Sequence, residues 1–321
     1  MSDTTRTLRI GTRGSRLAMW QAERVRDLLA QAAPDLEVEI VVVHTLGDRD
    51  QQTPLAQLGG VGVFTKEIEE ALRRDRCDVA VHSLKDVPTE LEAGFRLVAM
   101  LEREDPRDAL VARAGLGLDA LPPGSVVGTS SLRRRSQLKH LRPDLQLCDL
   151  RGNVQTRLRA VGVEVEEGRA PKRDDIAATF LAVAGLKRLG LDEHISEALD
   201  PARFLPAPAQ GVIGIEIRDD DSLAAEALGA LDHAETRIRA TAERTFLRTL
   251  EGGCRVPIAA LAERRGDDLV LQGAVGDLSG ERFLRDQVQG ADPVALGQAL
   301  AARLLDAGAR SILDQLREAQ R

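Results

Sequence analysis

The sequence predicts an α/β protein in which two similar lobes with mixed sheets flank a cleft, followed by a small α+β domain. The chain has 321 residues, more than one simple hydrophobic core accommodates. Segments with strand-like and helical patterns alternate along it, which is typical of parallel or mixed sheets. The alternation begins again near Glu102, and the stretch IGTRGSRL of the first half is loosely matched by VGTSSLRR in the second.

The first half predicts strands that each run into a turn. The stretch LRIGTRGS predicts a strand and a turn, and Ser15 is a candidate N-cap for the helical segment SRLAMWQAERVRDLLAQA. LEVEIVVVHTLGD predicts the next strand, FTKEIEEALRRDR a helix, and CDVAVHSLKDVP a strand that ends in a loop. Ligands of open α/β sheets bind beyond the carboxyl ends of strands, so the polar turns there are the candidate site.

The second half repeats this order before the pattern changes. SVVGTSS and DLQLCDLRG predict strands, LRRRSQLKHLR and NVQTRLRAV the helices after them, and IAATFLAVAGLKRLG a buried run with a short helix. The charged segment Val163–Asp175 predicts a solvated loop. The tail contains the helical segment ETRIRATAERTFLRTL, three strand-like runs, and a helix with Leu296, Leu300 and Leu304 at four-residue spacing. This tail predicts the α+β domain.

Composition and charge argue against several classes of protein. The chain carries a net charge of −7, whereas a general nucleic-acid binder is usually basic. It has no run of about 18 apolar residues, and its first residues lack the apolar region of a secretory signal. We therefore expect a cytoplasmic protein with no membrane and no nucleic-acid partner. Cys77, Cys148 and Cys254 are far apart, which argues against a disulfide framework and against a zinc site.

Arginines follow three of the predicted strand-to-helix turns. Arg133 and Arg134 lie in the first turn of one predicted helix, Arg151 and Arg157 bracket the start of another, and Arg13 follows the first strand. A cation is mildly unfavourable at a helix N-terminus, because that end carries partial positive charge. Free backbone amides and guanidinium groups together form a site for carboxylate or phosphate. Any one of these arginines could be a solvated surface residue, but three such turns favour a site for a small polyanion.

The stretch HSLKDVP places Lys85 and Asp86 at the end of a buried strand. One interpretation is an aspartate that caps a turn beside a surface lysine. The other is a carboxylate that stays ionised in a cationic site and stabilises a developing positive charge. We expect His82, on the same strand, to be a packed or hydrogen-bonded histidine and not a catalyst.

Cys254 follows two glycines in LEGGCRVP. The glycines predict a helix end, and the partial negative charge there disfavours a thiolate. No histidine lies near Cys254 in the sequence. An activated nucleophile therefore fits poorly, and an attachment site fits better.

Seven stretches together resemble the porphobilinogen deaminase family, also called the hydroxymethylbilane synthases: HSLKDVPT, EREDPRDAL, GTSSLRRRSQL, LRGNVQTRL, LAVAGLKRLGL, AQGVIGIE and LEGGCRVPI. The resemblance covers nearly the whole chain. It implies two lobes like those of type II periplasmic binding proteins, with residues 1–101 plus 212–230 in the first lobe, 102–211 in the second and 231–321 in the C-terminal domain. It also implies a monomeric transferase of tetrapyrrole biosynthesis that condenses four porphobilinogen molecules head to tail, releases ammonia, and hydrolyses off the linear product.

The resemblance also implies roles for single residues. Asp86 would be the catalytic carboxylate near the pyrrole nitrogens, and Cys254 would hold a dipyrromethane cofactor through a thioether. The residues implied to bind acetate and propionate groups are Lys85, Ser131, Arg133 and Arg134 for the cofactor, and Arg13, Ser15, Arg151 and Arg157 for the substrate. No metal is implied.

Three positions depart from the family pattern. Leu46 and Val61 stand where basic residues are usual, in or beside a segment that resembles a mobile lid, and Gln155 stands where glycine is common. Two alternatives stay open: a two-lobed protein that binds an anionic small molecule, and a homologue that binds the cofactor but turns over poorly. A pure binder would have no use for Cys254.

Overall fold

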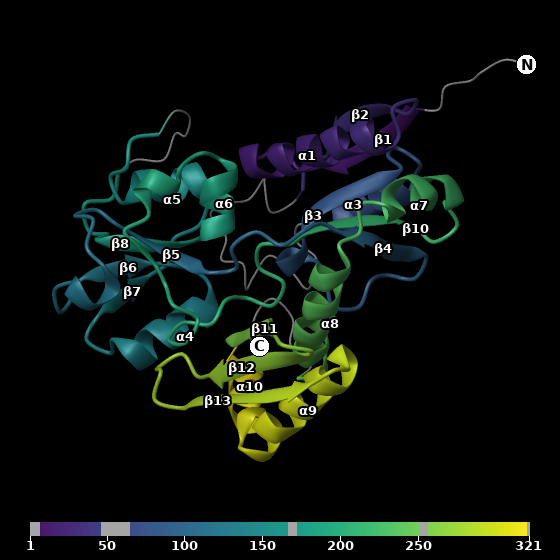
Figure 1. The fold of residues 1–321 in the computed structure, drawn as a ribbon. Coiled ribbons are helices and arrows are strands. Elements are labelled where there is room, and N and C mark those ends of the chain that lie inside the picture. The colour runs from purple at the N-terminus through teal and green to yellow at the C-terminus, as the bar shows by residue number, and fades with distance from the viewer. Residues whose placement is uncertain (1–6, 46–64, 166–171, 251–255, 320–321) are drawn as a thin grey trace, which may run out of the picture. The chain divides into compact units, whose positions relative to one another are not determined.

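The computed structural model describes residues 7–45, 65–165, 172–250 and 256–319 (Figure 1). Its contacts divide the chain into two compact units: unit 1 is Met1–Glu104 with Val212–Arg237, and unit 2 is Asp105–Gly211 with Ile238–Arg321. The predicted fold class is confirmed, because each unit contains a five-stranded mixed sheet and unit 2 also contains a small α+β region. The boundaries of three domains, and the cleft, stay predictions. None of the described helices is long and apolar enough to cross a membrane.

The two five-stranded sheets share one topology. In unit 1 the order is β2-β1-β3-β10-β4, and in unit 2 it is β7-β6-β8-β5-β9. In each sheet the first three strands are parallel, and the fourth runs antiparallel to both of its neighbours. The loose sequence repeat therefore corresponds to a repeated sheet.

The elements of unit 1 follow the predicted order. Its strands and helices are β1 (Thr7–Thr12), α1 (Arg16–Ala32), β2 (Glu37–Val42), α3 (Lys66–Arg73), β3 (Val79–Ser83), β4 (Phe95–Met100), β10 (Ile213–Arg218) and α7 (Ser222–Gly229). Helix α1 forms because Ala18, Ala22, Val25 and Leu29 recur at helical spacing and are buried. The last three join the apolar side chains of β1, β3 and β10 in one core.

Unit 2 begins with the second five-stranded sheet. Its strands and helices are β5 (Asp108–Ala112), β6 (Val126–Gly128), α4 (Leu132–Leu141), β7 (Gln146–Cys148), α5 (Val154–Ala160), β8 (Ala178–Ala182), α6 (Val183–Arg188) and β9 (Glu197–Ala198). Alternate side chains of β5 enter two different cores, Leu110 in one and Ala109 and Val111 in the other. The sheet is therefore covered on both faces, as is usual for mixed sheets that contain parallel strands.

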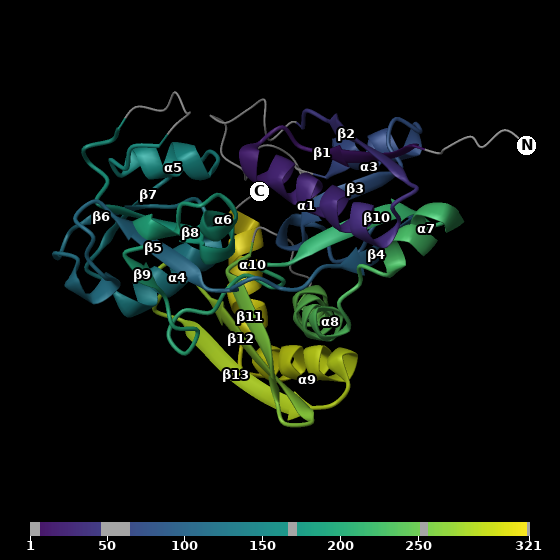
Figure 2. The ribbon, with the colours of Figure 1, turned by 45° about the horizontal axis from the view of Figure 1, so that its top comes forward.

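The α+β region completes unit 2. It contains α8 (Ala234–Thr249), which begins in unit 1, then β11 (Ile258–Arg265), β12 (Asp268–Gly276), β13 (Phe283–Gly290), α9 (Pro293–Asp306) and α10 (Ala309–Ala319). The strands form an antiparallel sheet, and α9 packs against β12 and β13 (Figure 2). Leu296, Leu300 and Leu304 of α9 are buried in its core, as their spacing predicted.

This α+β region contacts helix α4 within unit 2. The rings of His140 and Phe283 stack with their centroids 4.5 Å apart. His140 Nδ1 also lies 3.0 Å from the carbonyl oxygen of Gly280. Gly280 has a φ of +78°, and a Cβ there would lie 2.3 Å from the backbone nitrogen of His140, so only glycine fits. The turn between β12 and β13 is thereby fixed against α4.

Candidate functional site

The turn after β3 carries two of the predicted site residues. Lys85 and Asp86 belong to a single 3₁₀ turn, Leu84–Asp86, directly after the strand. Leu84 and Val87 are buried, whereas Lys85 and Asp86 are half-buried. The amide of Val87 donates a hydrogen bond to the Leu84 carbonyl at 3.2 Å. The core thus fixes the turn on both sides while a carboxylate and an ammonium group stay accessible.

The turn after β1 lies at the same edge of the sheet, because β1 and β3 are adjacent parallel strands. Ser15 is the N-cap of α1, as predicted: its hydroxyl oxygen accepts a hydrogen bond from the amide of Ala18 at 3.4 Å. Arg13, just before it, is half-buried. The buried Gln21 of α1 donates from Nε2 to Ser83 Oγ at 2.9 Å, which ties the helix to the end of β3. The two turns therefore form one polar edge of unit 1.

A buried acid–base pair lies on the strands behind this edge. His82 Nε2 of β3 is 2.9 Å from Glu216 Oε2 of the neighbouring strand β10, and both side chains are buried. The expectation that His82 is hydrogen-bonded is confirmed. Glu69 of α3 is also buried; burial and the negative charge of Glu216 raise its pKa. Sequence reasoning missed Glu216 and Glu69, because their burial and their partners become visible only in the folded structure.

In unit 2 the turns after β6 and β7 lie at one edge, because these strands are also adjacent and parallel. The amide of Thr129 donates to the carbonyl of Cys148 at 2.9 Å, which joins the two turns. Ser131 is the N-cap of α4, and its hydroxyl oxygen accepts from the amide of Arg134 at 3.5 Å. The sequence pattern GTSS therefore produces the same strand, turn and capped helix as in unit 1.

The turn after β7 and the helix α5 that follows it carry the other two predicted arginines. Arg151 is half-buried in the turn, and Arg157 of α5 donates from Nε to the carbonyl of Gly152 at 3.0 Å. Gly152 has a φ of +114°, and a Cβ there would lie 2.4 Å from the Thr156 side chain, so the turn requires glycine. Asn153 caps α5 through Oδ1, which accepts from the amide of Thr156 at 2.8 Å.

Arg133 and Arg134 are placed differently from the other arginines. Both are buried, and both bind Asp108 at the start of β5: Arg133 Nη1 lies 2.5 Å from Oδ2, and Arg134 Nη2 lies 2.7 Å from Oδ1. Burial opposes ionisation of Asp108, but the two guanidinium charges dominate and hold its pKa below the usual range. The two arginines also donate to the carbonyls of Leu205 and Phe180, each at 2.8 Å. The sequence did not indicate Asp108 as their partner, although it lies in the quoted motif EREDPRDAL.

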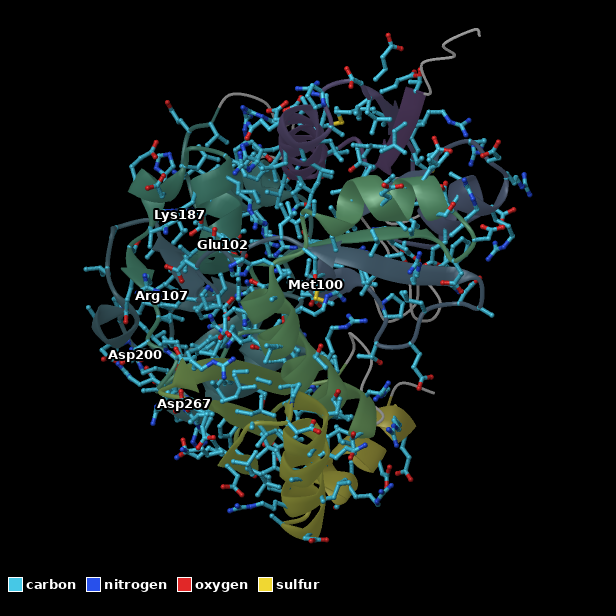
Figure 3. The ribbon with its side chains drawn as sticks, turned by 45° about the vertical axis from the view of Figure 1, so that its right-hand side comes forward. Met100, Glu102, Arg107, Lys187, Asp200 and Asp267 are labelled. Carbon is cyan, nitrogen blue, oxygen red and sulfur yellow. The ribbon has the colours of Figure 1, made fainter. Side chains whose placement is uncertain are left out.

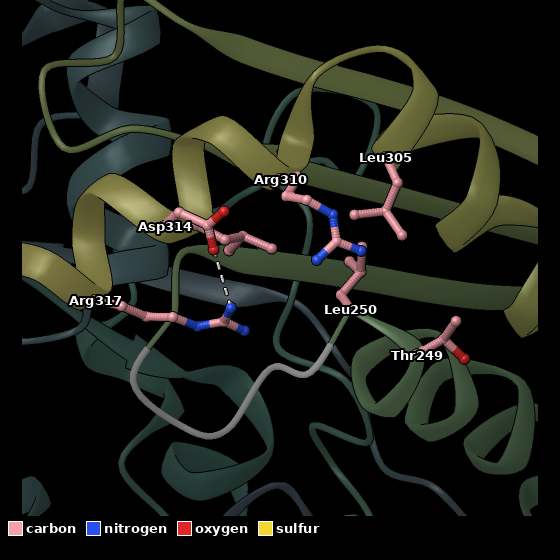
Figure 4. Close-up of a pocket in the computed structure, with 7 residues that line it drawn as sticks. Thr249, Leu250, Leu305, Arg310, Asp314 and Arg317 are labelled. Atoms are coloured by element: carbon pink, nitrogen blue, oxygen red, sulfur yellow. Dashed lines mark hydrogen bonds and ion pairs between the residues drawn. The ribbon is translucent and has the colours of Figure 1, made fainter.

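Three positions of the sequence analysis lie outside the described residues, namely Cys254, Leu46 and Val61. The residues on either side of the segment that contains Cys254 are described. Leu250 is buried in the core of the α+β region, and Val256 packs against the same core. Leu250 also lines a small pocket with Leu305 and Arg310 (Figure 4). Both ends of that segment are therefore anchored in one core.

The chemistry of the two edges suits an anionic ligand. Unit 1 offers a carboxylate among cations, and unit 2 offers guanidinium groups and capping hydroxyls. Among the residues that the structure describes, no three His, Cys, Asp or Glu side chains form a group that could hold a metal ion. Cations on rigid turns are the donors that carboxylate groups require.

Comparisons with known proteins agree with these features. Residues 8–226 match the family model "Porphobilinogen deaminase, dipyromethane cofactor binding domain", and residues 237–306 match "Porphobilinogen deaminase, C-terminal domain". The chain is 48% identical over 315 residues to the porphobilinogen deaminase of Pelobacter propionicus, covering 97% of each chain. It is 50% identical over 310 residues to that of Stenotrophomonas maltophilia, covering 96% of this chain and 99% of that one.

Solved structures show a weaker similarity. Immunogenic lipoprotein A from Vibrio vulnificus is 12% identical with a TM-score of 0.44, covering 71% of this chain and 96% of that one. The periplasmic aliphatic sulphonate binding protein SsuA from Escherichia coli is 14% identical with a TM-score of 0.38, covering 94% of this chain and 87% of that one.

Proposed function

This chain belongs to the porphobilinogen deaminase family, and we propose on that basis that it is a hydroxymethylbilane synthase of tetrapyrrole biosynthesis. This transferase condenses four porphobilinogen molecules head to tail, releases ammonia, and hydrolyses off the linear product. The observation that carries the proposal is a sequence identity of 48% and 50% to two curated porphobilinogen deaminases, over nearly the full length of each. We further propose that it acts as a cytoplasmic monomer.

Asp86 is the proposed catalytic residue. Its carboxylate would accept hydrogen bonds from pyrrole N–H groups and stabilise the positive charge that develops as ammonia leaves the substrate. The buried neighbours Leu84 and Val87 support this role, because they hold the turn still while Asp86 stays half-buried. Lys85, the neighbouring residue of the same turn, would bind an acetate or propionate group.

The remaining cations would bind the carboxylates of cofactor and substrate. Each pyrrole unit brings two carboxylates, so the lengthening product needs many fixed cations. In unit 1 the proposed ligands are Arg13, Ser15 and Lys85, and in unit 2 they are Ser131, Arg133, Arg134, Arg151 and Arg157. Two guanidinium groups and one carboxylate leave the cluster of Arg133, Arg134 and Asp108 with a net charge of +1. That charge would attract an anion even though the two guanidinium groups already donate hydrogen bonds to Asp108 and to backbone carbonyls.

Cys254 is the proposed anchor of the dipyrromethane cofactor. The donor set fits this group, since a dipyrromethane carries the same carboxylates as the substrate and the described turns present cations and hydroxyls. Bound through a thioether, it supplies the pyrrole end on which the product is built. The thiol needs no strong activation for this single attachment, which agrees with its expected place just after a helix C-terminus. Leu250 and Val256, which precede and follow the segment that contains Cys254, belong to one core, and this supports the C-terminal region as the place of attachment.

Intact mass is the experiment that tests the proposal. Protein purified from a host that makes porphobilinogen should exceed the mass of the bare polypeptide by one dipyrromethane. Cys254→Ser should prevent normal loading, and Asp86→Asn should keep the added mass while nearly abolishing turnover. A bare polypeptide with no turnover would favour the alternative of a small-molecule binder. Full activity of Asp86→Asn would show that the catalytic assignment is wrong.

A further inference from the structure

Gln155 has a buried amide nitrogen for which the described protein supplies no hydrogen-bond acceptor. It lies in the first turn of α5 and is 3% exposed. Its Nε2 atom is buried and has no hydrogen-bond partner among the described residues. Buried polar side chains are nearly always hydrogen-bonded, because desolvation without a partner is costly. An apolar side chain of the same size would avoid that cost, so the amide requires another explanation.

The position of Gln155 puts its side chain at the polar edge of unit 2. Side chains on a helix point back towards its N-terminus and cover the preceding turn. For Gln155 this turn is Arg151–Asn153, which directly precedes α5 at the edge where β6 and β7 end. Leu158, one turn further along the same face, is fully buried in the core that covers the sheet. The amide is therefore held between this core and the turn that contains Arg151.

A second polar group at the same edge also has no partner. Ser130 lies between the end of β6 and the cap of α4, and its Oγ is buried without a hydrogen-bond partner in the described part of the chain. The amide nitrogen of Gln155 can only donate, and a hydroxyl can donate as well. Two donors on the turns after adjacent strands, one of which also carries Arg151, match an anion with several acceptor atoms.

We propose that Gln155 is a binding residue that donates a hydrogen bond from Nε2 to a carboxylate of the bound pyrrole chain, with Ser130 as a second donor. The proposal rests on the proposed function for the identity of that ligand. Glycine, the common residue at this position, has no side chain to contribute. This chain therefore has a donor that a glycine-bearing homologue lacks, and it should hold its substrate more tightly for that reason.

Gln155→Met tests the proposal, because methionine keeps the volume and removes the polar atoms. We expect the thermal midpoint of the unloaded protein to stay level or rise, while KM for porphobilinogen increases about tenfold, the effect of one lost hydrogen bond to a charged group. Gln155→Glu, which places a carboxylate against a carboxylate, should raise KM further. The matched control is Gln137→Met: the buried Gln137 amide exchanges hydrogen bonds with Leu205, so this variant should lose stability.

The outcomes separate this inference from the proposed function. If both wild type and Gln155→Met carry the dipyrromethane mass and share one KM, the inference is wrong and the proposed function stands. If neither carries it, the proposed function fails, and the site is tested with citrate as a simple polycarboxylate. Citrate should then raise the thermal midpoint of wild type more than that of Gln155→Met. An equal rise would overturn the inference.

Discussion

Replacing Asp108 by asparagine should destabilise unit 2 strongly. Asp108 is fully buried, and its two oxygens accept hydrogen bonds from both Arg133 and Arg134. Asparagine keeps the shape and one acceptor but removes the only charge that offsets two guanidinium groups in this cluster. Removing one partner of a buried ion pair costs about 3–5 kcal/mol. For a unit of this size, that corresponds to a fall in thermal midpoint of roughly 10 °C or more.

The matched control is Asp105→Asn, three residues earlier. Asp105 is 12% exposed and pairs with Arg107 at 2.7 Å, and its Oδ2 lies 4.0 Å from Lys187 Nζ. The side chains of both cations, which are labelled in Figure 3, are 42% and 44% exposed. Water reaches both cations and screens the pair, so its loss should cost about 1 kcal/mol, well below the cost expected for Asp108. Urea unfolding of both variants measures the difference. Equal losses would refute the argument that burial, and not ion pairing as such, gives Asp108 its effect.

The pH dependence of the same variant gives an independent check. The pKa of Asp108 is lower in the folded protein than the ordinary value of 3.8. Because its pKa is lowered by folding, ionised Asp108 stabilises the folded state at pH values above the pKa that it has in the unfolded chain. This contribution is lost as pH falls below that value. The stability gap between wild type and Asp108→Asn should therefore be constant from neutral pH to about pH 5 and should narrow below about pH 4. A gap that does not change between pH 7 and pH 3 would contradict the assigned pKa shift.

Two further changes test other parts of the fold. Because burial and Glu216 raise the pKa of Glu69, wild type should lose stability as pH rises through that pKa. Glu69→Gln should thus raise the urea midpoint at pH 8 but not at pH 4. An equal effect at both pH values would contradict the raised pKa of Glu69. His140→Ala removes the stacking on Phe283 and the hydrogen bond to Gly280, which should lower the free energy of unfolding by about 1–2 kcal/mol. An unchanged midpoint for His140→Ala would show that this contact contributes nothing.

Local features of the fold and site could be predicted because their causes are local. Ser15 caps a helix since its hydroxyl reaches an amide three residues later, and the three leucines of α9 mark one face of one helix. The Lys85–Asp86 turn was likewise visible as polar residues at the end of an apolar strand. Each of these depends on a few neighbouring residues, so periodicity and turn chemistry suffice.

Features that depend on distant partners could not be predicted in this way. An arginine in the first turn of a helix has the same sequence pattern whether it contacts a ligand or a buried carboxylate. The partner of Arg133 and Arg134 lies about 25 residues earlier, on β5, and only the folded sheet brings it there. The pairing of Glu216 with His82 spans 134 residues for the same reason.

The buried polar groups at the edge of unit 2 are of two kinds, and stability measurements can separate them. Arg133 and Arg134 are buried with their hydrogen bonds made, so removing their partner Asp108 should lower stability. Gln155 Nε2 and Ser130 Oγ are buried atoms without partners in the described protein, so an apolar replacement of Gln155 should leave stability level or raise it. The proposed ligand would supply the hydrogen bonds that the second kind lacks in the described protein. Opposite signs for Asp108→Asn and Gln155→Met would therefore distinguish residues that build this edge from residues that bind at it.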